Sequence, residues 1–162
     1  MSTQVRYFRS QNYIPGEELP EDRALAGGFY VRAVFDGDTP LYAEVFARNT
    51  LQNVIHYGCD LSDPELLPSH RRRYGTAALT AYAPPVRAPE GELHTLKEWE
   101  AKSDLFFTTK RLVDPRGEPL REEIFDSQGA FRGVRRFEYE GAELTRIVFT
   151  RADGVEIVEL ED

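Results

Sequence analysis

Turn-forming clusters recur at a near-constant spacing in the C-terminal half of this chain. They are built from Gly, Asp and other small or polar residues, and they lie roughly 12 to 14 residues apart. The segments between them are rich in Phe, Tyr, Val, Ile and Thr, as β-strands are. This spacing predicts consecutive hairpins, because Gly and Asp reach turn geometries that β-branched residues avoid. The four clusters are Asp114-Pro115-Arg116-Gly117, Asp126-Ser127-Gln128-Gly129, Glu140-Gly141 and Ala152-Asp153-Gly154.

The first half of the chain repeats the spacing. Turn signals at Asp36-Gly37-Asp38 and at Asn49 separate three segments of alternating apolar and polar residues. Residues 29–57 are therefore predicted to form a first meander of three strands. Residues 1–28 are mixed in composition and contain two prolines, and we expect an irregular N-terminal segment there.

Residues 58–91 interrupt the strand pattern. Ser62-Asp63-Pro64-Glu65 has the form of a helix start, with a capping residue followed by proline at the first helical position. Pro68 is expected to end this first helix, and Ser69 to cap a second one that runs to Tyr82. Prolines at 84, 85 and 89 predict an extended linker. The interruption is thus predicted to be a short helical insertion near 62–82 followed by a proline-rich linker.

Residues 92–161 are predicted to form a second meander of six strands. Residues 92–101 fit either a helix or a strand, and we assign a strand because a turn signal follows at Lys102-Ser103-Asp104. The predicted fold class is mainly β, an antiparallel up-and-down meander of about nine strands in a single domain over residues 1–162. One face of the predicted sheet is apolar and the other is mixed. Two arrangements fit this pattern: a sheet strongly curved or closed into a barrel, and an open sheet whose second face is left for a partner.

Composition restricts the classes of partner. The formal charge is −8 and the isoelectric point is near 5.0, so the surface repels nucleic-acid phosphates and anionic membranes. We therefore expect no nucleic-acid and no membrane partner, and a protein partner with a basic surface is favoured. Cys59 is the only cysteine, and neither a signal peptide nor a membrane-spanning apolar run is present, which predicts a cytoplasmic protein.

One dense basic cluster stands out in this acidic chain. It consists of His70, Arg71, Arg72, Arg73 and Tyr74. Arginine makes forked, charge-assisted hydrogen bonds, so these residues are candidates for binding a phosphate or a carboxylate-bearing partner. The alternative is an exposed helical turn that pairs with the protein's own acidic side chains.

The remaining candidate binding residues are Trp99, Arg132 and Arg136. In a closed barrel, aromatic side chains and neighbouring arginines would line a pocket for an apolar anion. The alternative for the arginines of this region is cross-strand pairing with glutamates such as Glu122, each pair contributing a few tenths of a kcal/mol, roughly.

Catalytic and metal chemistry have little support in the sequence. His56 and Cys59 form a His-x-x-Cys pair, and a nucleophilic thiol would need such a base and a lowered pKa. One cysteine and three scattered histidines do not supply an ordered set of zinc ligands, and we expect no metal and no cofactor.

Three functions follow as expectations, in this order. The first is a non-catalytic binding protein that engages another protein, for example as the neutraliser of a basic toxin or nuclease. The second is a small-molecule carrier barrel for an apolar or anionic ligand, which requires a closed sheet around a cavity. The third is an enzyme, with His56, Cys59 and an arginine as the place to look.

Overall fold

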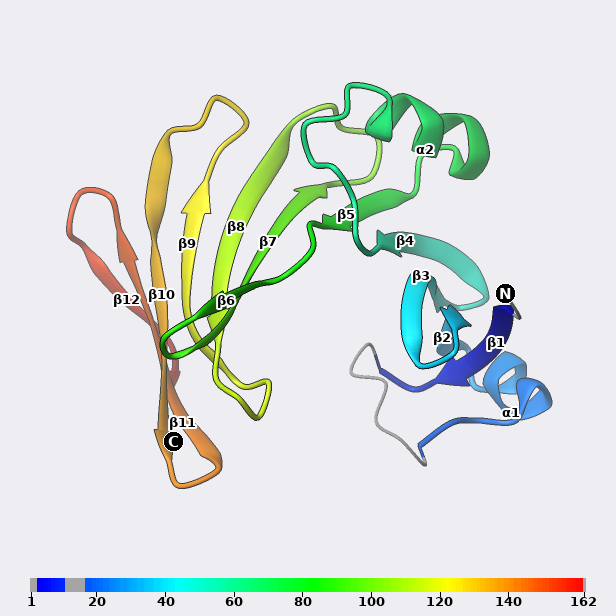
Figure 1. Cartoon of the computed structure of the whole chain (residues 1–162), viewed down its shortest axis with the longest axis horizontal. Helices are drawn as coiled ribbons and strands as arrows, with labels where there is room; N and C mark the ends of the chain where they lie inside the picture. Colours follow the sequence, from blue (N-terminus) through cyan, green and yellow to red (C-terminus); the bar gives the residue numbers. More distant parts are fainter. Residues whose placement is uncertain (1–2, 11–16, 162) are drawn as a thin grey trace. The chain divides into compact units, whose positions relative to one another are not determined.

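The computed structural model describes residues 3–10 and 17–161, and it confirms a mainly β protein. Twelve strands of the described chain form one mixed, mostly antiparallel sheet, accompanied by two helices (Figure 1). The strand order is β1-β2-β3-β4-β5-β7-β8-β9-β10-β11-β12, with the short β6 paired to β7.

Two parts of the fold prediction are wrong, the count of about nine strands and the closed barrel. The additional strands are β1, β5 and β6, which lie outside the two regular meanders. The sheet is not closed, because its order begins at β1 and ends at β12 with no pairing between them in the described chain. Closure requires a matched tilt and stagger of all strands, and the spacing of turns along a sequence carries neither quantity.

The chain divides into two compact units. Unit 1 comprises Met1–Tyr82 and Glu98–Asp104, and unit 2 comprises Ala83–Lys97 and Leu105–Asp162. The expected single domain over residues 1–162 stays a prediction.

Unit 1 is built around four antiparallel strands followed by one parallel strand. The β4–β5 pair is parallel, and α2 lies in the connection between them. Its elements are β1 (Thr3–Phe8), α1 (Glu21–Ala26), β2 (Phe29–Asp36), β3 (Thr39–Ala47), β4 (Thr50–His56), α2 (Leu66–Tyr74) and β5 (Ala78–Tyr82).

The N-terminal segment is more regular than expected. Thr3–Phe8 pairs with β2 over its whole length, and Glu21–Ala26 is helical. The strand was missed because Gln4 and Arg6 interrupt its apolar residues, whereas its stability comes from pairing with residues that are distant in sequence. Residues 1–2 and 11–16 of the expected irregular segment lie outside the described residues.

The helical insertion is shorter than expected. Pro68 does not end a helix: it occupies the first turn of α2, where a missing N–H leaves no hydrogen bond unmade. The helix ends at Gly75, whose φ of 65° is a left-handed geometry that glycine adopts readily. The expected continuation to Tyr82 is wrong, because residues 78–82 form β5. This strand has three consecutive buried residues, as parallel strands covered on both faces do.

The core of unit 1 lies on one face of its first four strands. It is formed by Phe8 of β1, Val31, Ala33 and Phe35 of β2, Ala43 and Val45 of β3, and Ile55 of β4. The opposite face carries polar and aromatic side chains, and the candidate residues of α2 belong to that side.

Unit 2 continues with antiparallel strands. Most of β7 belongs to this unit, and its presence confirms the strand assigned to residues 92–101. The strands are β6 (Val86–Ala88), β7 (Gly91–Trp99), β8 (Phe106–Val113), β9 (Pro119–Phe125), β10 (Phe131–Glu140), β11 (Glu143–Arg151) and β12 (Glu156–Glu161).

Three of the four recurrent turns of unit 2 are built alike. At the turns that start at Asp114, Asp126 and Arg151, the first residue donates its N–H to the carbonyl four residues ahead and accepts a bond from a glycine N–H. The three glycines have φ values of 87°, 80° and 85°, so each occupies the left-handed position of a three-residue hairpin loop. Here the sequence pattern is confirmed at the level of individual hydrogen bonds.

Candidate functional site

Five side chains of β3, β4 and α2 gather on the polar face of unit 1, and we call them the α2 cluster. They are Tyr42, His56, His70, Arg73 and Tyr74. His56 lies 6.1 Å from Tyr42, 6.1 Å from Tyr74 and 6.4 Å from His70 between ring centroids. The guanidinium of Arg73 lies over the rings of Tyr42 and Tyr74, at 5.5 and 5.0 Å. Three of the five predicted α2 residues, His70, Arg73 and Tyr74, are thus brought together with two residues that the sequence did not single out for binding.

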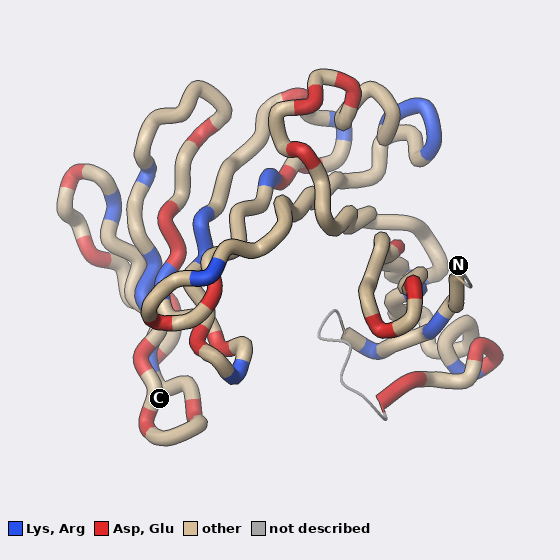
Figure 2. Tube along the Cα trace, viewed as in Figure 1, with Lys and Arg blue, Asp and Glu red and all other residues tan. Residues whose placement is uncertain are grey.

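The other two arginines of α2 leave the cluster. Arg71 donates to the carbonyl of Ser103 at 2.6 Å, and Arg72 pairs with Glu65 at 3.0 Å. Figure 2 shows the basic residues at the end of α2 and acidic residues in the segment before it. Each arginine of the dense basic run thus makes a different contact, and the binding role predicted for the run stays a prediction.

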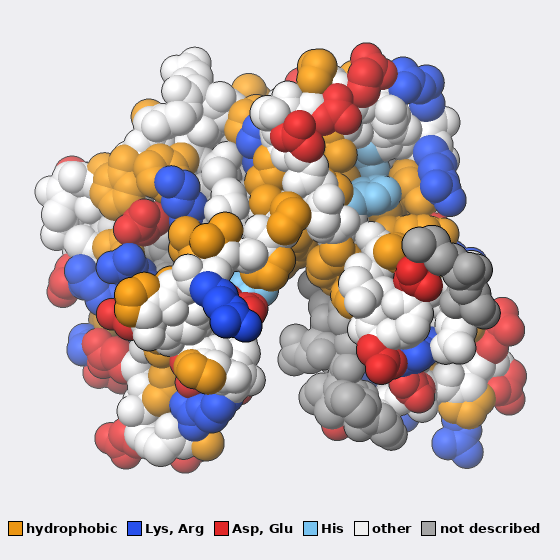
Figure 3. All heavy atoms as spheres, in the orientation of Figure 1, with side chains coloured by type: hydrophobic (Ala, Val, Ile, Leu, Met, Phe, Trp, Pro, Cys, Tyr) orange, Lys and Arg blue, Asp and Glu red, His pale blue; other side chains and the backbone are white. Residues whose placement is uncertain are grey.

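The pKa values of both histidines of the α2 cluster are shifted downwards, which favours the neutral form. Burial lowers the pKa of His56 and of His70, and nearby positive charge lowers both further. His70 is 2 % exposed, and its Nε2 lies 2.8 Å from the carbonyl of Ala77, so this nitrogen carries the proton. Burial also raises the pKa of Tyr74, which keeps its hydroxyl protonated. Figure 3 shows histidine, hydrophobic and basic side chains adjoining at the surface in the region of α2.

Two buried polar atoms of the α2 cluster have no hydrogen-bond partner: Nδ1 of His70 and the hydroxyl of Tyr74. Both atoms are closed off from solvent, so a ligand at the surface of the protein does not reach them. The exposed member of the cluster is Arg73.

Cys59 shows no sign of activation. Burial raises the pKa of its thiol, which is opposite to what a nucleophile needs. Its Sγ contacts the carbonyl of Tyr57 at 3.9 Å, and no contact with His56 is found among the described residues.

The remaining predicted binding residues are dispersed. Trp99 is 7 % exposed and is part of the packed interior. Arg132 is exposed and lies 3.6 Å from Asp126, whereas Arg136 is exposed and donates to the hydroxyl of Thr150 at 3.4 Å. Their binding roles stay predictions.

An ion-pair network in unit 2 joins residues that the sequence only partly indicated. Glu122 accepts from Arg111 at 2.6 Å and from Arg135 at 2.7 Å, and its side chain is 5 % exposed. Arg135 also binds Glu159 through two bonds of 2.6 and 3.0 Å, which raises the pKa of Arg135 and lowers that of Glu159. The expected cross-strand pairing of Glu122 with an arginine of β10 is confirmed, but its burial was not foreseen.

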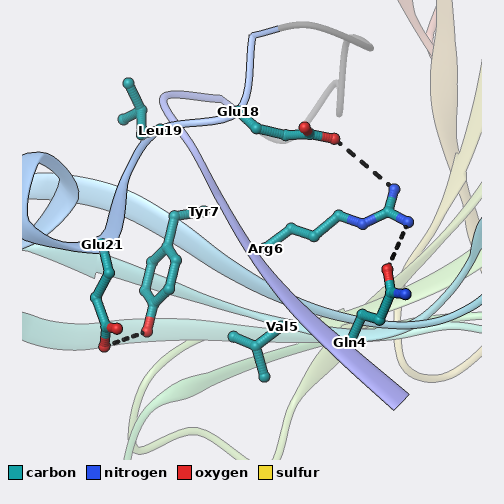
Figure 4. Close-up of a pocket in the computed structure, with 7 residues that line it drawn as sticks. All are labelled: Gln4, Val5, Arg6, Tyr7, Glu18, Leu19 and Glu21. Carbon is teal, nitrogen blue, oxygen red and sulfur yellow. Dashed lines mark hydrogen bonds and ion pairs between the residues drawn. The ribbon is translucent and has the colours of Figure 1, made fainter. Parts of the chain in front are cut away.

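A cavity of about 620 Å3 lies beside β1 (Figure 4). Its polar side chains are already used by one another. Arg6 lies 3.7 Å from Glu18 and donates to Gln4 at 3.0 Å, and the hydroxyl of Tyr7 donates to Glu21 at 2.8 Å. A ligand entering this cavity would have to break these contacts before it made its own.

The outer edge of β12 is an unpaired edge of the sheet in the described chain. Within the described chain β11 is its sole partner, and five of its six residues are exposed. The N–H of Arg151 donates to the carbonyl of Val155, so these two residues form a hydrogen-bonded pair of the β11–β12 ladder. Hydrogen-bonded and non-hydrogen-bonded pairs alternate along an antiparallel ladder. Thr150–Glu156 is therefore a non-hydrogen-bonded pair, and Phe149–Ile157 is the next hydrogen-bonded one. The N–H and C=O groups of Glu156 and Val158 therefore point away from β11.

Three further findings bear on function. In residues 3–10 and 17–161, no group of three or more His, Cys, Asp or Glu residues is placed to hold a metal ion. None of the helices in that part of the chain is long and apolar enough to cross a membrane. No protein-family model and no curated protein matches the sequence.

Proposed function

We propose that this chain is a non-catalytic binding protein that engages another protein, one with a basic surface, through the outer edge of β12. The observation that supports the proposal is the combination of features at that edge. Outward-pointing backbone groups, exposed apolar side chains and carboxylates lie within one short strand and the turn before it.

The apolar contribution comes from Val155, Ile157 and Val158, which are 49, 45 and 44 % exposed. Ile157 and Val158 are consecutive residues of a strand and point to opposite faces, so a partner added at this edge would bury apolar area on both faces. The backbone groups of Glu156 and Val158 offer hydrogen bonds to an added strand, which is a common mode of peptide recognition.

Charge supports a basic partner. Glu156 has no ion pair in the described chain, and the pair of Glu161 with Arg146 is long, at 3.8 Å. The formal charge of −8 adds a long-range attraction for a cationic protein. A basic toxin or nuclease is a partner of this chemistry, and strand addition over its basic surface would neutralise it by occlusion.

The carrier alternative required a closed sheet around a cavity. Since the sheet is open, we do not carry that barrel forward as a proposal.

Site-specific photo-crosslinking in an extract of the host organism tests the proposal. A benzophenone side chain at position 158 is expected to give a covalent adduct with a basic protein. The yield of this adduct should fall as the salt concentration rises from about 0.1 M to about 1 M, because the Debye length then shortens from about 10 Å to about 3 Å. Val86 is the matched control, because it is an exposed valine of the same unit on another strand. Glu156→Pro should reduce the adduct, because proline removes both an outward N–H and the Glu156 carboxylate and leaves the bonds to β11 intact. Equal labelling from positions 158 and 86, or no adduct at 158, would contradict the proposal.

A further inference from the structure

A second cavity of unit 1 has a volume of about 350 Å3, and its charged side chains, unlike those of the first cavity, have no ion-pair partner in the described chain. Arg23 of α1 and Phe29 at the start of β2 line it, together with Arg9, which follows β1, and with Leu19 and Gly27, which flank α1. The volume lies in the range of small-ligand sites. Leu19 and Phe29 form the apolar part of its wall, and Arg9 and Arg23 the charged part.

The two arginines of this cavity are uncompensated. Neither Arg9 nor Arg23 forms an ion pair with a carboxylate of the described chain, although the protein carries 28 acidic residues against 20 basic ones. In the first cavity, by contrast, Arg6 is held by Glu18 and Asp38. An anion bound in this cavity would accept charge-assisted hydrogen bonds from arginines that have no carboxylate partner in the described chain.

The apolar part of the wall indicates that the ligand also has an apolar body. Phe29 is 48 % exposed, whereas the next two residues of β2 are buried. Leu19 extends the apolar surface on the other side of the cavity. An apolar body laid against Phe29 and Leu19 would bury surface that is now in water.

We infer that this cavity binds an amphiphilic anion, a small molecule with an apolar or aromatic body and one carboxylate, sulfonate or phosphate group. The anionic group would accept forked hydrogen bonds from the guanidinium groups of Arg9 and Arg23, which both line the cavity. The apolar body would lie on Phe29 and Leu19. This site is independent of the β12 edge, which belongs to unit 2.

Two fluorescent probes that share one aromatic body separate the two parts of the inference. 1-Anilinonaphthalene-8-sulfonate carries the anionic group, and N-phenyl-1-naphthylamine lacks it. The sulfonate is expected to bind the wild-type protein at least about tenfold more tightly than the neutral probe, because a charge-assisted hydrogen bond carries at least that much affinity. The Arg9→Ala, Arg23→Ala double variant should lose this preference, and Phe29→Ser should weaken both probes.

The controls use the same chain. Arg87→Ala removes an exposed arginine of unit 2 and should leave the binding of both probes unchanged. Because Arg9 and Arg23 are exposed, their removal is not expected to unfold the protein, and an unchanged circular dichroism spectrum checks this. Equal affinity for the two probes, or sulfonate binding that survives loss of both arginines, would overturn the inference. A loss of sulfonate binding in Arg87→Ala would do so too.

Discussion

Replacing Glu122 with glutamine should destabilise the protein by about 2–3 kcal/mol. The carboxylate of Glu122 is 5 % exposed and accepts two charge-assisted bonds, from Arg111 and Arg135, at 2.6 and 2.7 Å. Glutamine has the same shape but only one acceptor atom, so one arginine keeps a weaker bond and the other meets an amide NH2 group. Each bond to a charged group contributes about 1.5–3 kcal/mol net. The two arginines are about one third exposed and can recover some hydration, which keeps the cost below the upper end for a fully buried pair.

Urea unfolding monitored by circular dichroism measures this cost. With a denaturant slope of about 2 kcal/mol per molar, the expected change shifts the midpoint by roughly 1 M or slightly more. Glu65→Gln is the matched control, because Glu65 pairs with Arg72 at 3.0 Å while both side chains are about two thirds exposed. That substitution should cost less than about 1 kcal/mol.

The comparison between the two variants decides the argument. If Glu122→Gln cost no more than Glu65→Gln, burial would not strengthen the network, and our account of unit 2 would be wrong. Amide hydrogen exchange in β9 and β10 gives a second readout, since both strands carry residues of the network.

Three more perturbations follow from the structure. Burial lowers the pKa of His56 and His70, so these histidines bind protons at a higher pH in the unfolded chain than in the folded one. The stability of the protein should therefore fall as the pH drops below about 6.5. The urea midpoint of His70→Asn should fall less steeply over that range than the midpoint of the wild-type protein. Gly133→Ala should cost about 1–3 kcal/mol by thermal unfolding, because its Cβ would lie 2.5 Å from the carbonyl of Thr150, and an unchanged melting temperature would refute the close packing. Backbone hydrogen bonds lower the pKa of Asp114, so its contribution to its turn should be lost as the pH falls through that pKa, and Asp114→Ala should speed amide exchange at Glu118 already at neutral pH.

The turns were predictable from the sequence because their information is local. The Asp, the Gly and the three-residue loop of each turn lie within five consecutive residues, and the hydrogen bonds close within that span. The strands β1 and β5 were not predictable in the same way. Each is held by a neighbour that is remote in sequence, and β5 pairs in parallel, which no hairpin signal announces.

The basic run of α2 shows why the candidate site was predicted only in part. Consecutive residues of a helix point about 100° apart, so neighbours in sequence are not neighbours on the surface. Arg71, Arg72 and Arg73 accordingly reach Ser103, Glu65 and Tyr42, respectively. The arginines of the second cavity carry no sequence signal at all, because Arg9 and Arg23 are separated by a segment that contains no pattern linking them.

The two proposed sites should respond to salt in different ways, and this difference follows from the distribution of charge. A basic partner at the β12 edge is attracted by the whole acidic protein, so both its association rate and its affinity should decrease steeply as salt screens the long-range field. An amphiphilic anion at Arg9 and Arg23 experiences opposing influences: the net charge of −8 repels it at a distance, and the two guanidiniums attract it on contact. Salt weakens both effects, so the affinity for the sulfonate probe should change little between about 0.1 M and about 1 M salt. A steep loss of sulfonate binding over that range would mean that long-range attraction dominates, which the charge of this chain does not permit for an anion.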